Sequence, residues 1–267
     1  MTLVHEDKTK ILRRCFFDVQ NYVGLGRQEE DYHSACKFWL TEHQVPFVSK
    51  PAHTLLLRGQ VAHTLYPDLV VWDTITIELK SVARDLRATE FVQLFDYLKC
   101  RNDPLGLLVN LGLDRVHVER IVFEPQEIVL EEDWDYWTGQ ISGRVRDVGI
   151  AVRDALRMVY REHSTGYGEE VTERLILFAL QTCGLKSTIK PVAKAYYHGI
   201  ELHESRLNCI VIEDCMLLTV TALFDSNAFS INRGKSYLRA LGLNWGIAVN
   251  FGKTKAEFTG LRRAASK

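Results

Sequence analysis

The chain has 267 residues, of which 46% are hydrophobic, and a formal net charge of −1 at pH 7. This is enough sequence for two ordinary domains with sizeable cores. No run of about 18 apolar residues occurs, and the first residues lack the apolar core of a signal peptide, so we expect a soluble, cytoplasmic protein without a membrane span. The six cysteines show neither a Cys-x-x-Cys pair nor zinc-site spacing, which favours buried free thiols over a structural zinc site.

Helical and strand patterns follow one another along the first half of the chain. Apolar residues at helical spacing predict a helix over Lys8–Tyr22, a second from about Glu29 to Leu40, and a third over Ala88–Cys100. Runs of β-branched, aromatic or continuously apolar residues predict strands at Leu55–Leu57, Leu69–Trp72, Ile75–Leu79 and Leu105–Leu111. The predicted order is helix, helix, three strands, helix, strand. An acidic stretch from about Val118 to Ser142 follows.

The second half of the chain repeats the first at an offset of 140 residues, the difference between Gly26 and Gly166. About 20 of the roughly 100 pairs between residues 13–112 and 153–252 are identical, against about 6 expected from ordinary composition. We therefore predict a tandem duplication. Its parts are a domain at 1–123, an acidic linker at 124–143 and a second domain at 144–267.

Two acids and a lysine stand at the ends of two adjacent predicted strands. A tight turn at Asp73-Thr74 would place Asp68 nearly opposite Glu78. Lys80 shares a face with Glu78 because strand side chains alternate. Three charged groups would then converge, and such a set can bind a divalent metal and activate a water. The alternative is that Glu78-Leu79-Lys80 forms an ordinary solvated strand end.

These positions have changed in the second copy, whereas glycines and apolar positions persist. The gapless alignment pairs Asp68 with Asn208, Glu78 with Leu218, Lys80 with Val220 and Gln93 with Arg233. A slip of one residue would offer Thr219 and Thr221, which are no better as metal ligands or as a base. The contrast suggests that only the first copy performs chemistry. The simpler explanation is that exposed residues diverge faster than core residues.

The spacing Pro67-Asp68, Glu78-Leu79-Lys80 resembles the signature of the PD-(D/E)xK nuclease superfamily. The segment from Gly26 through Glu29 to Tyr32 is a Gly-x-x-Glu-x-x-Tyr match, and with Gln93 to Tyr97 it is similar to the bacterial GxxExxY family within that superfamily. The similarity covers about Ile11 to Phe123. It implies a mixed α/β fold of two tandem restriction-endonuclease-like domains, each a small sheet flanked by helices, arranged as a pseudo-dimer with a degenerate second copy.

The resemblance also implies roles for individual residues. Asp68, Glu78, the Leu79 carbonyl and Glu29 would hold Mg²⁺ or Mn²⁺, and Lys80 would orient or deprotonate the attacking water. Gln93 would help to hold the substrate or the lysine. The candidates for substrate contact are Tyr32, Tyr97, Arg84 and Arg87. Because Tyr97 recurs as Tyr237, a packing role is favoured for it.

These roles amount to a metal-dependent nuclease with one active site, acting on DNA in preference to RNA, with further oligomerisation possible. The net charge argues neither for nor against nucleic acid, although several basic residues cluster near the candidate site. The alternative is a non-catalytic nucleic-acid-binding or regulatory protein on a nuclease fold. A weaker alternative is a protein scaffold that uses an exposed aromatic patch of Trp134, Tyr136 and Trp137.

Overall fold

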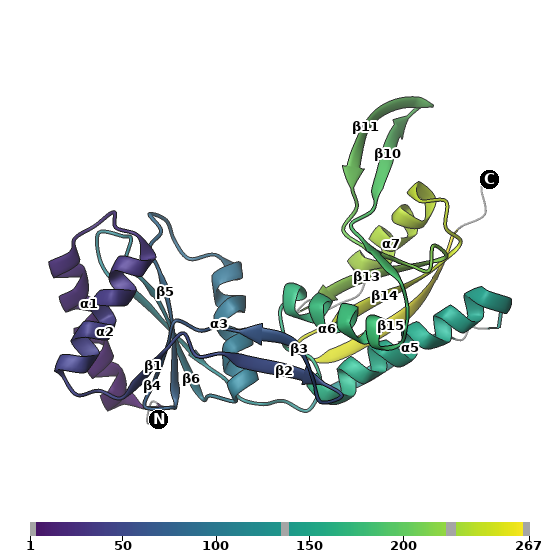
Figure 1. Cartoon of the computed structure of the whole chain (residues 1–267). Coiled ribbons are helices and arrows are strands. Elements are labelled where there is room, and N and C mark those ends of the chain that lie inside the picture. The colour runs from purple at the N-terminus through teal and green to yellow at the C-terminus, as the bar shows by residue number, and fades with distance from the viewer. Residues whose placement is uncertain (1–3, 135–138, 223–227, 264–267) are drawn as a thin grey trace. The chain divides into compact units, whose positions relative to one another are not determined.

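The computed structural model describes residues 4–134, 139–222 and 228–263, so Tyr136 and Trp137 lie outside the described residues. The chain forms two compact units (Figure 1). Unit 1 comprises residues 1–55 and 64–125, and unit 2 comprises residues 56–63 and 126–267. Each unit contains a mixed sheet with helices packed on it, which confirms the predicted fold class.

Unit 1 is built on a five-stranded sheet with the order β1-β4-β5-β6-β7. The central pair β5–β6 is parallel and the other pairs are antiparallel. The helices are α1 (Glu6–Val23), α2 (Glu29–Glu42) and α3 (Ala88–Arg101). The sheet strands are β1 (Phe47–Ser49), β4 (Leu69–Val71), β5 (Ile75–Lys80), β6 (Leu105–Asn110) and β7 (His117–Val122). The strands β2 (His53–Leu57) and β3 (Gln60–Leu65) form a separate hairpin, whose residues 56–63 belong to unit 2.

The alternation of side chains along β5 sets the two faces of this sheet. Ile75, Ile77 and Leu79 belong to the core cluster formed with α1 and α2. Glu78 and Lys80 therefore point to the opposite face, the one that α3 covers (Figure 1). On that face Gly106 of β6 leaves room for α3, since an added Cβ would lie 3.0 Å from the side chain of Leu94.

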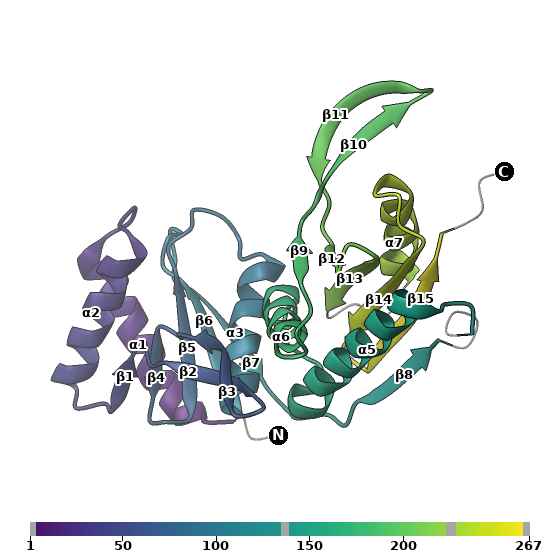
Figure 2. The same cartoon turned by 45° about the vertical axis from the view of Figure 1, so that its right-hand side comes forward.

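Unit 2 has a six-stranded sheet with the order β8-β15-β14-β13-β12-β9 (Figure 2). Its helices are α5 (Gly143–His163), α6 (Glu169–Thr182) and α7 (Ala228–Ala240). The strands are β8 (Val129–Asp133), β9 (Ser187–Ile189), β12 (Ile210–Ile212), β13 (Met216–Ala222), β14 (Trp245–Phe251) and β15 (Lys255–Arg262). A long hairpin of β10 (Val192–Tyr197) and β11 (Ile200–Arg206) forms a separate two-stranded sheet.

The sequence-based prediction missed β1, β3 and β7 in the first copy, their counterparts β9, β11 and β15 in the second, and β8 between the copies. The acidic stretch that we expected to be a linker contains β8, which pairs in parallel with β15. The sequence pattern did not indicate a strand here, because its acidic residues suggested a solvated segment. In the structure Glu132 forms ion pairs with Arg153 and Arg157 of α5 instead of facing solvent. The segment between the copies is therefore partly an edge strand of unit 2.

The structure also corrects the pairing of the two copies around the candidate site. Lys50 N donates to the Asp68 carbonyl, and its counterpart Lys190 N donates to the carbonyl of Cys209, in both cases at 2.9 Å. Lys80 lies beside Asn110 in its sheet, and Thr221 lies beside Asn250. The gapless pairing with Asn208, Leu218 and Val220 is therefore wrong by one residue. The true counterparts of Asp68, Glu78 and Lys80 are Cys209, Thr219 and Thr221.

Cys15, Cys36 and Cys209 are buried free thiols. Among the described residues, no helix combines the length and the apolar character needed to cross a bilayer.

The parallel pair β5–β6 carries the core of unit 1, which gives a direct stability test. Leu107 in β6 is fully buried, so Leu107→Ala should lower the free energy of unfolding of this unit by about 2–5 kcal/mol. Leu25→Ala, at a leucine that is 56% exposed, is the matched control and should change it little. Chemical denaturation of both variants measures this difference, and equal losses would contradict the assigned core.

Candidate active site

The candidate site begins with the hairpin β4–β5. Leu69 pairs with Ile77 and Val71 with Ile75, so continuing the register by one residue sets Asp68 opposite Glu78. The turn lies at Trp72-Asp73, one residue before the predicted place, with φ of 50° and 54°. Positive φ at both central residues is the turn geometry that matches the right-handed twist of a hairpin. The local fold of this segment therefore brings the two carboxylates together.

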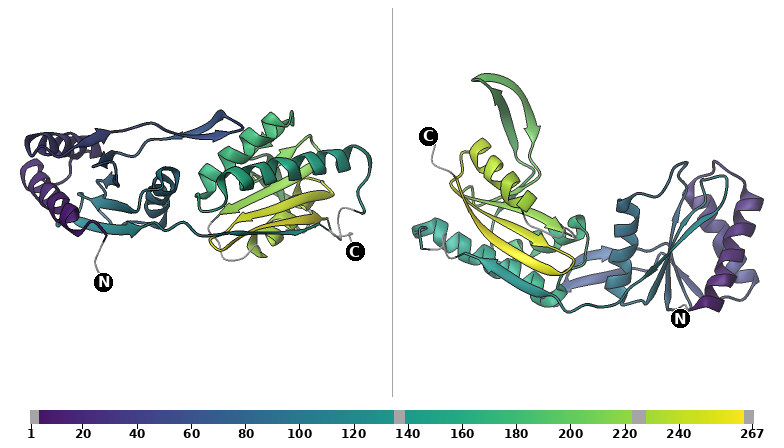
Figure 3. Two further views of the ribbon diagram at one scale, coloured as in Figure 1. Left: turned by 90° about the horizontal axis from the view of Figure 1, so that it is seen from below. Right: turned by 180° about the vertical axis from the view of Figure 1, so that it is seen from behind.

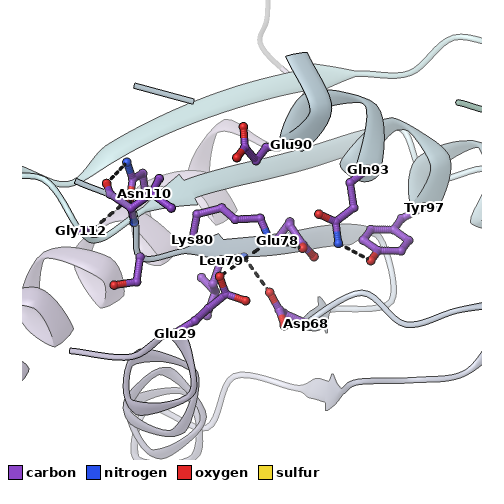
Figure 4. Close-up of polar contacts among 12 residues, drawn as sticks. Glu29, Asp68, Glu78, Leu79, Lys80, Glu90, Gln93, Tyr97, Asn110 and Gly112 are labelled. Carbon is purple, nitrogen blue, oxygen red and sulfur yellow. Dashed lines mark hydrogen bonds and ion pairs between the residues drawn. The ribbon is translucent and has the colours of Figure 1, made fainter. Parts of the chain in front are cut away.

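Asp68 is held on several sides. Its Oδ2 accepts a hydrogen bond of 2.8 Å from the backbone N–H of Leu79, and its side chain is nearly buried (Figure 4). Its backbone carbonyl is contacted by Nε2 of the buried His33 at 3.2 Å. Sequence reasoning gave His33 no role, and no motif could have identified it because it touches only the backbone of Asp68. His33 also contacts Ser49 and Glu30.

Glu78 is the most buried carboxylate of the site, and its ionised form is disfavoured there. Its side chain is 3% exposed, and Oε1 accepts a 2.6 Å hydrogen bond from Lys80 Nζ. Within the described residues, Oε2 is buried and has no hydrogen-bond partner. Burial raises the pKa of Glu78 to about 8, and the nearby charge of Asp68 adds to this rise. A buried carboxylate oxygen without a donor is suited to a cation.

Lys80 and Glu29 complete the charged cluster. Burial alone would lower the pKa of Lys80, but the acids around it, Glu78 first, raise it, so the ammonium form is favoured. Glu29 is the first residue of α2, and its Oε2 lies 3.8 Å from Lys80 Nζ. Burial and the charge of Asp68 raise the pKa of Glu29 although Lys80 opposes them. The helix start thus presents a third carboxylate beside the lysine.

Tyr32 does not reach this cluster. It is fully buried in the core of α1 and α2, and its hydroxyl donates to the Gly24 carbonyl at 2.7 Å. Direct contact with a substrate, which we expected, is therefore wrong for this residue. Tyr32 instead fixes the turn that precedes Glu29.

Gln93 and Tyr97 lie one helical turn apart on α3, on the Glu78 side of the sheet (Figure 4). Gln93 Nε2 donates to Tyr97 Oη at 2.9 Å. Burial raises the pKa of Tyr97, and the charge of Glu78 raises it further, so the phenol stays protonated. The structure brings this pair close to the carboxylates, with Tyr97 largely buried.

The loop between β5 and α3 carries Arg84 and Arg87. Arg84 forms an ion pair of 2.6 Å with Glu90, which also accepts from the backbone N–H of Arg87. The side chain of Arg87 is exposed. Sequence reasoning did not single out Glu90, although an acid three residues into a helix is the ordinary sign of a helix start.

Asn110 at the end of β6 is a further residue to which sequence reasoning gave no role. Its fully buried amide donates to the carbonyls of Val82 and Arg84 and accepts from the N–H groups of Val82 and Gly112. The close approach requires Gly112, because an added Cβ there would lie 2.4 Å from Val82 N. The recurrence of Asn110 as Asn250 in the second copy was the sequence signal that could have identified it. Asn110 thus fixes the loop that follows Lys80.

The backbone of Leu79 faces the same side as Asp68. Its N–H donates to Asp68, and the N–H and C=O of one strand residue point to the same neighbour. The carbonyl of the next residue, Lys80, accepts from Leu111 N on the opposite side, toward β6. The Leu79 carbonyl is therefore directed past the end of β4, toward Asp68.

This donor set fits a hard divalent cation that keeps several waters. Asp68 and Glu78 offer two carboxylates and Leu79 a carbonyl, the oxygen ligands that Mg²⁺ and Mn²⁺ prefer. In the described part of the chain, no group of three or more His, Cys, Asp or Glu side chains is placed to hold a metal ion. Glu29 in this structure contacts Lys80, so it does not act as a third convergent side chain.

The matching place in unit 2 has lost this chemistry. Thr219 and Ser230 share a hydrogen bond of 3.0 Å, and Thr221 bonds to Asn250 and the Val249 carbonyl. Burial raises the pKa of the Cys209 thiol to about 12, so it remains uncharged. Neutral groups that satisfy one another have replaced two acids and a lysine.

The role of Asn110 leads to a prediction about the loop after Lys80. Asn110→Asp keeps an acceptor but sets an oxygen against two carbonyls, so it should cost about 1–3 kcal/mol of stability and speed amide exchange over residues 81–87. Asn102→Asp, at an exposed position with φ of 55°, is the control, because Asp also tolerates that conformation. Hydrogen exchange measures both variants. Unchanged exchange in Asn110→Asp would contradict the assignment.

Comparison with known proteins identifies the family of the chain. No curated protein matches the chain. A solved structure titled "Crystal structure of SSO0001" aligns at 20% identity and a TM-score of 0.29. The alignment covers 37% of this chain and 52% of that chain, about half its length. The model of the PD-(D/E)XK nuclease superfamily matches residues 6–121 and again residues 146–264. Since these matches cover most of the chain, once in each copy, the protein belongs to the PD-(D/E)XK nuclease superfamily.

Proposed function

We propose that the protein is a metal-dependent nuclease that hydrolyses phosphodiester bonds at one active site, in the first copy. The observation that carries this proposal is the cluster of Asp68, Glu78 and Lys80, in which a buried oxygen of Glu78 has no hydrogen-bond partner among the described residues. Family membership supports the reaction class, and the neutral side chains of unit 2 support the single site. DNA is the favoured substrate over RNA.

Asp68 and Glu78 would hold Mg²⁺ or Mn²⁺ together with the carbonyl of Leu79. Glu29 would join through a bound water, because its contact with Lys80 leaves it at the margin of the site. Such an ion lowers the pKa of a bound water and neutralises charge on the phosphate. The high pKa of Glu78 fits this use, because the carboxylate gains a partner for its buried oxygen when the cation is present.

Lys80 would supply the positive charge next to the reacting phosphate. Its side chain is 13% exposed, and its ammonium group already lies between Glu78 and Glu29, so its position is set before substrate arrives. From there it orients the attacking water and stabilises negative charge that develops on the phosphate oxygens. Gln93, paired with Tyr97, would place a polar group on the α3 side of the same phosphate.

Arg84 and Arg87 would bind the phosphate backbone of the substrate. Arg87 is exposed and available, whereas Arg84 must exchange its ion pair with Glu90 for a phosphate contact. Membership of the GxxExxY family is also part of this proposal, since Gly26, Glu29 and Tyr32 match its motif at the start of α2.

Substitutions in the first copy should separate catalysis from folding. Glu78→Gln and Lys80→Ala should each reduce cleavage at least about 100-fold without unfolding the protein. Thr219→Val, at the counterpart of Glu78, is the matched control and should leave cleavage nearly unchanged. Labelled single- and double-stranded DNA and RNA with Mg²⁺ or Mn²⁺, and with EDTA as a blank, measure the activity. If both variants cut as well as the wild type, the site lies elsewhere.

The metal site can be tested without a substrate. Mg²⁺ or Mn²⁺ at about ten times its dissociation constant should stabilise the native protein by about 1.4 kcal/mol, which raises Tm by a few degrees. Glu78→Gln and Asp68→Asn should lose this increase, whereas Thr219→Val should keep it. Thermal unfolding with and without the metal supplies the measurement. An equal increase in all four proteins would show that the cation binds at another place.

A further inference from the structure

The hairpin β10–β11, residues 192–206, is here called the arm. Figures 1 and 3 show it projecting from the body of unit 2. A two-stranded ribbon by itself is marginally stable in water, and clustered exposed apolar side chains mark an interaction surface. Its exposed hydrophobic residues are Val192 (52%), Tyr196 (61%), Tyr197 (64%), Ile200 (65%) and Leu202 (55%).

One face of the arm is apolar and its charges balance. Tyr197 lies directly opposite Ile200, and Leu202 shares their face because strand side chains alternate. Two cations, Lys194 and Arg206, offset Glu201 and Glu204, and Lys194 is paired with Glu201 at 2.9 Å. A nucleic-acid-binding ribbon would carry excess positive charge. The arm is therefore suited to a protein surface.

The counterpart of the arm in the first copy, the hairpin β2–β3, shows what kind of surface such a tip binds. Both hairpins have the same turn, with φ of 51° and 76° at Arg58-Gly59 and of 48° and 80° at His198-Gly199. The tip of β2–β3, residues 56–63, belongs to unit 2. There it contacts the C-terminal half of helix α5.

These contacts of the β2–β3 tip are polar. Arg58 N donates to Glu162 Oε2 at 2.8 Å, and the Leu56 carbonyl is contacted by His163 Nε2 at 2.7 Å. The tip borders a cavity of about 310 Å³ with mostly charged walls. Its lining residues are Arg58, Asp154, Arg157, Met158, Arg161 and Glu162. The tip of the β2–β3 hairpin therefore binds α5, the first helix of the second repeat.

The first helix of the other repeat, α1, offers the equivalent surface with a different character. α1 and α5 end at equivalent residues, Val23 and His163. At the positions of Glu162 and Arg157, helix α1 carries Tyr22 and Phe17, which are 92% and 48% exposed. The polar tip of β2–β3 thus contacts a polar surface of α5. The apolar arm is matched in character by the apolar surface at the equivalent position of α1. Both surfaces are exposed in the described structure.

We propose that the arm of one chain docks on the Tyr22–Phe17 face of α1 in a second copy of this chain. Two chains that exchange arms in this way form a closed dimer. Each of its four repeats then docks a hairpin on the first helix of another repeat: the β2–β3 tip on α5, and the arm on α1 of the other chain. Such head-to-tail contacts close into a ring when the rotation permits and otherwise continue as a filament. This proposal is independent of nuclease activity.

Three variants and the mass in solution test it. The wild-type chain should sediment and scatter light as a dimer, at twice the chain mass of 30.6 kDa. An arm variant, Ile200→Glu with Leu202→Glu, and a helix variant, Phe17→Lys with Tyr22→Lys, should each be monomeric with near-native thermal unfolding. Val129→Glu, at an apolar residue that is 63% exposed outside both surfaces, is the control and should stay dimeric.

Mixing provides the decisive measurement. In a mixture of the arm and helix variants, one interface of the heterodimer is native and the other joins glutamates to lysines. The mixture should therefore recover dimers that neither variant forms alone. A monomeric wild type, dimers in both variants, or no recovery on mixing would each overturn the proposal. Loss of DNA binding in the arm variant with its dimer intact would instead identify a nucleic-acid contact.

Discussion

The candidate site depends on two carboxylates held side by side where little water reaches them. Asp68 is fixed by the N–H of Leu79 and through its backbone by His33 and Lys50, so it cannot turn away from Glu78. Their repulsion is relieved in part by Lys80. Burial, and after it the remaining repulsion from Asp68, raises the pKa of Glu78, and one oxygen of Glu78 has no donor in the part of the chain that the structure describes. A site under this constraint is prepared for positive charge.

The rest of unit 1 maintains this arrangement. The fully buried Tyr32 sets the start of α2 and thereby the place of Glu29, and Asn110 fixes the loop that leaves β5 after Lys80. None of these supporting residues has to meet the substrate. In unit 2 the carboxylates are gone but Asn250 persists, now bonded to Thr221. The supporting asparagine is retained there, whereas the thiol of Cys209 and the hydroxyls of Thr219 and Thr221 stand in place of the three charged groups.

Much of this could be predicted from the sequence where local patterns decide the structure. The β-branched runs around Trp72-Asp73 fixed the hairpin, and the hairpin set Asp68 opposite Glu78. Contacts between distant segments could not be predicted in this way. His33 contacts a backbone carbonyl 35 residues away, and Asn110 bonds backbone carbonyls 28 and 26 residues away, which leaves no spacing to recognise. The extra residue in β11, seven residues against six in β3, shifted the true pairing of the copies without disturbing their glycines.

The strand β8 changes what counts as the second repeat. By sequence the repeat begins near Gly143, but its sheet begins at Val129, because β8 covers the outer edge of β15. A fragment cut at residue 143 would expose that edge along five paired residues, and open strand edges recruit other chains. The two copies therefore cannot be separated at the point where the sequence similarity ends. The chain between them is a structural part of the second copy, so a fragment of that copy must begin before Val129 to keep the edge of β15 covered.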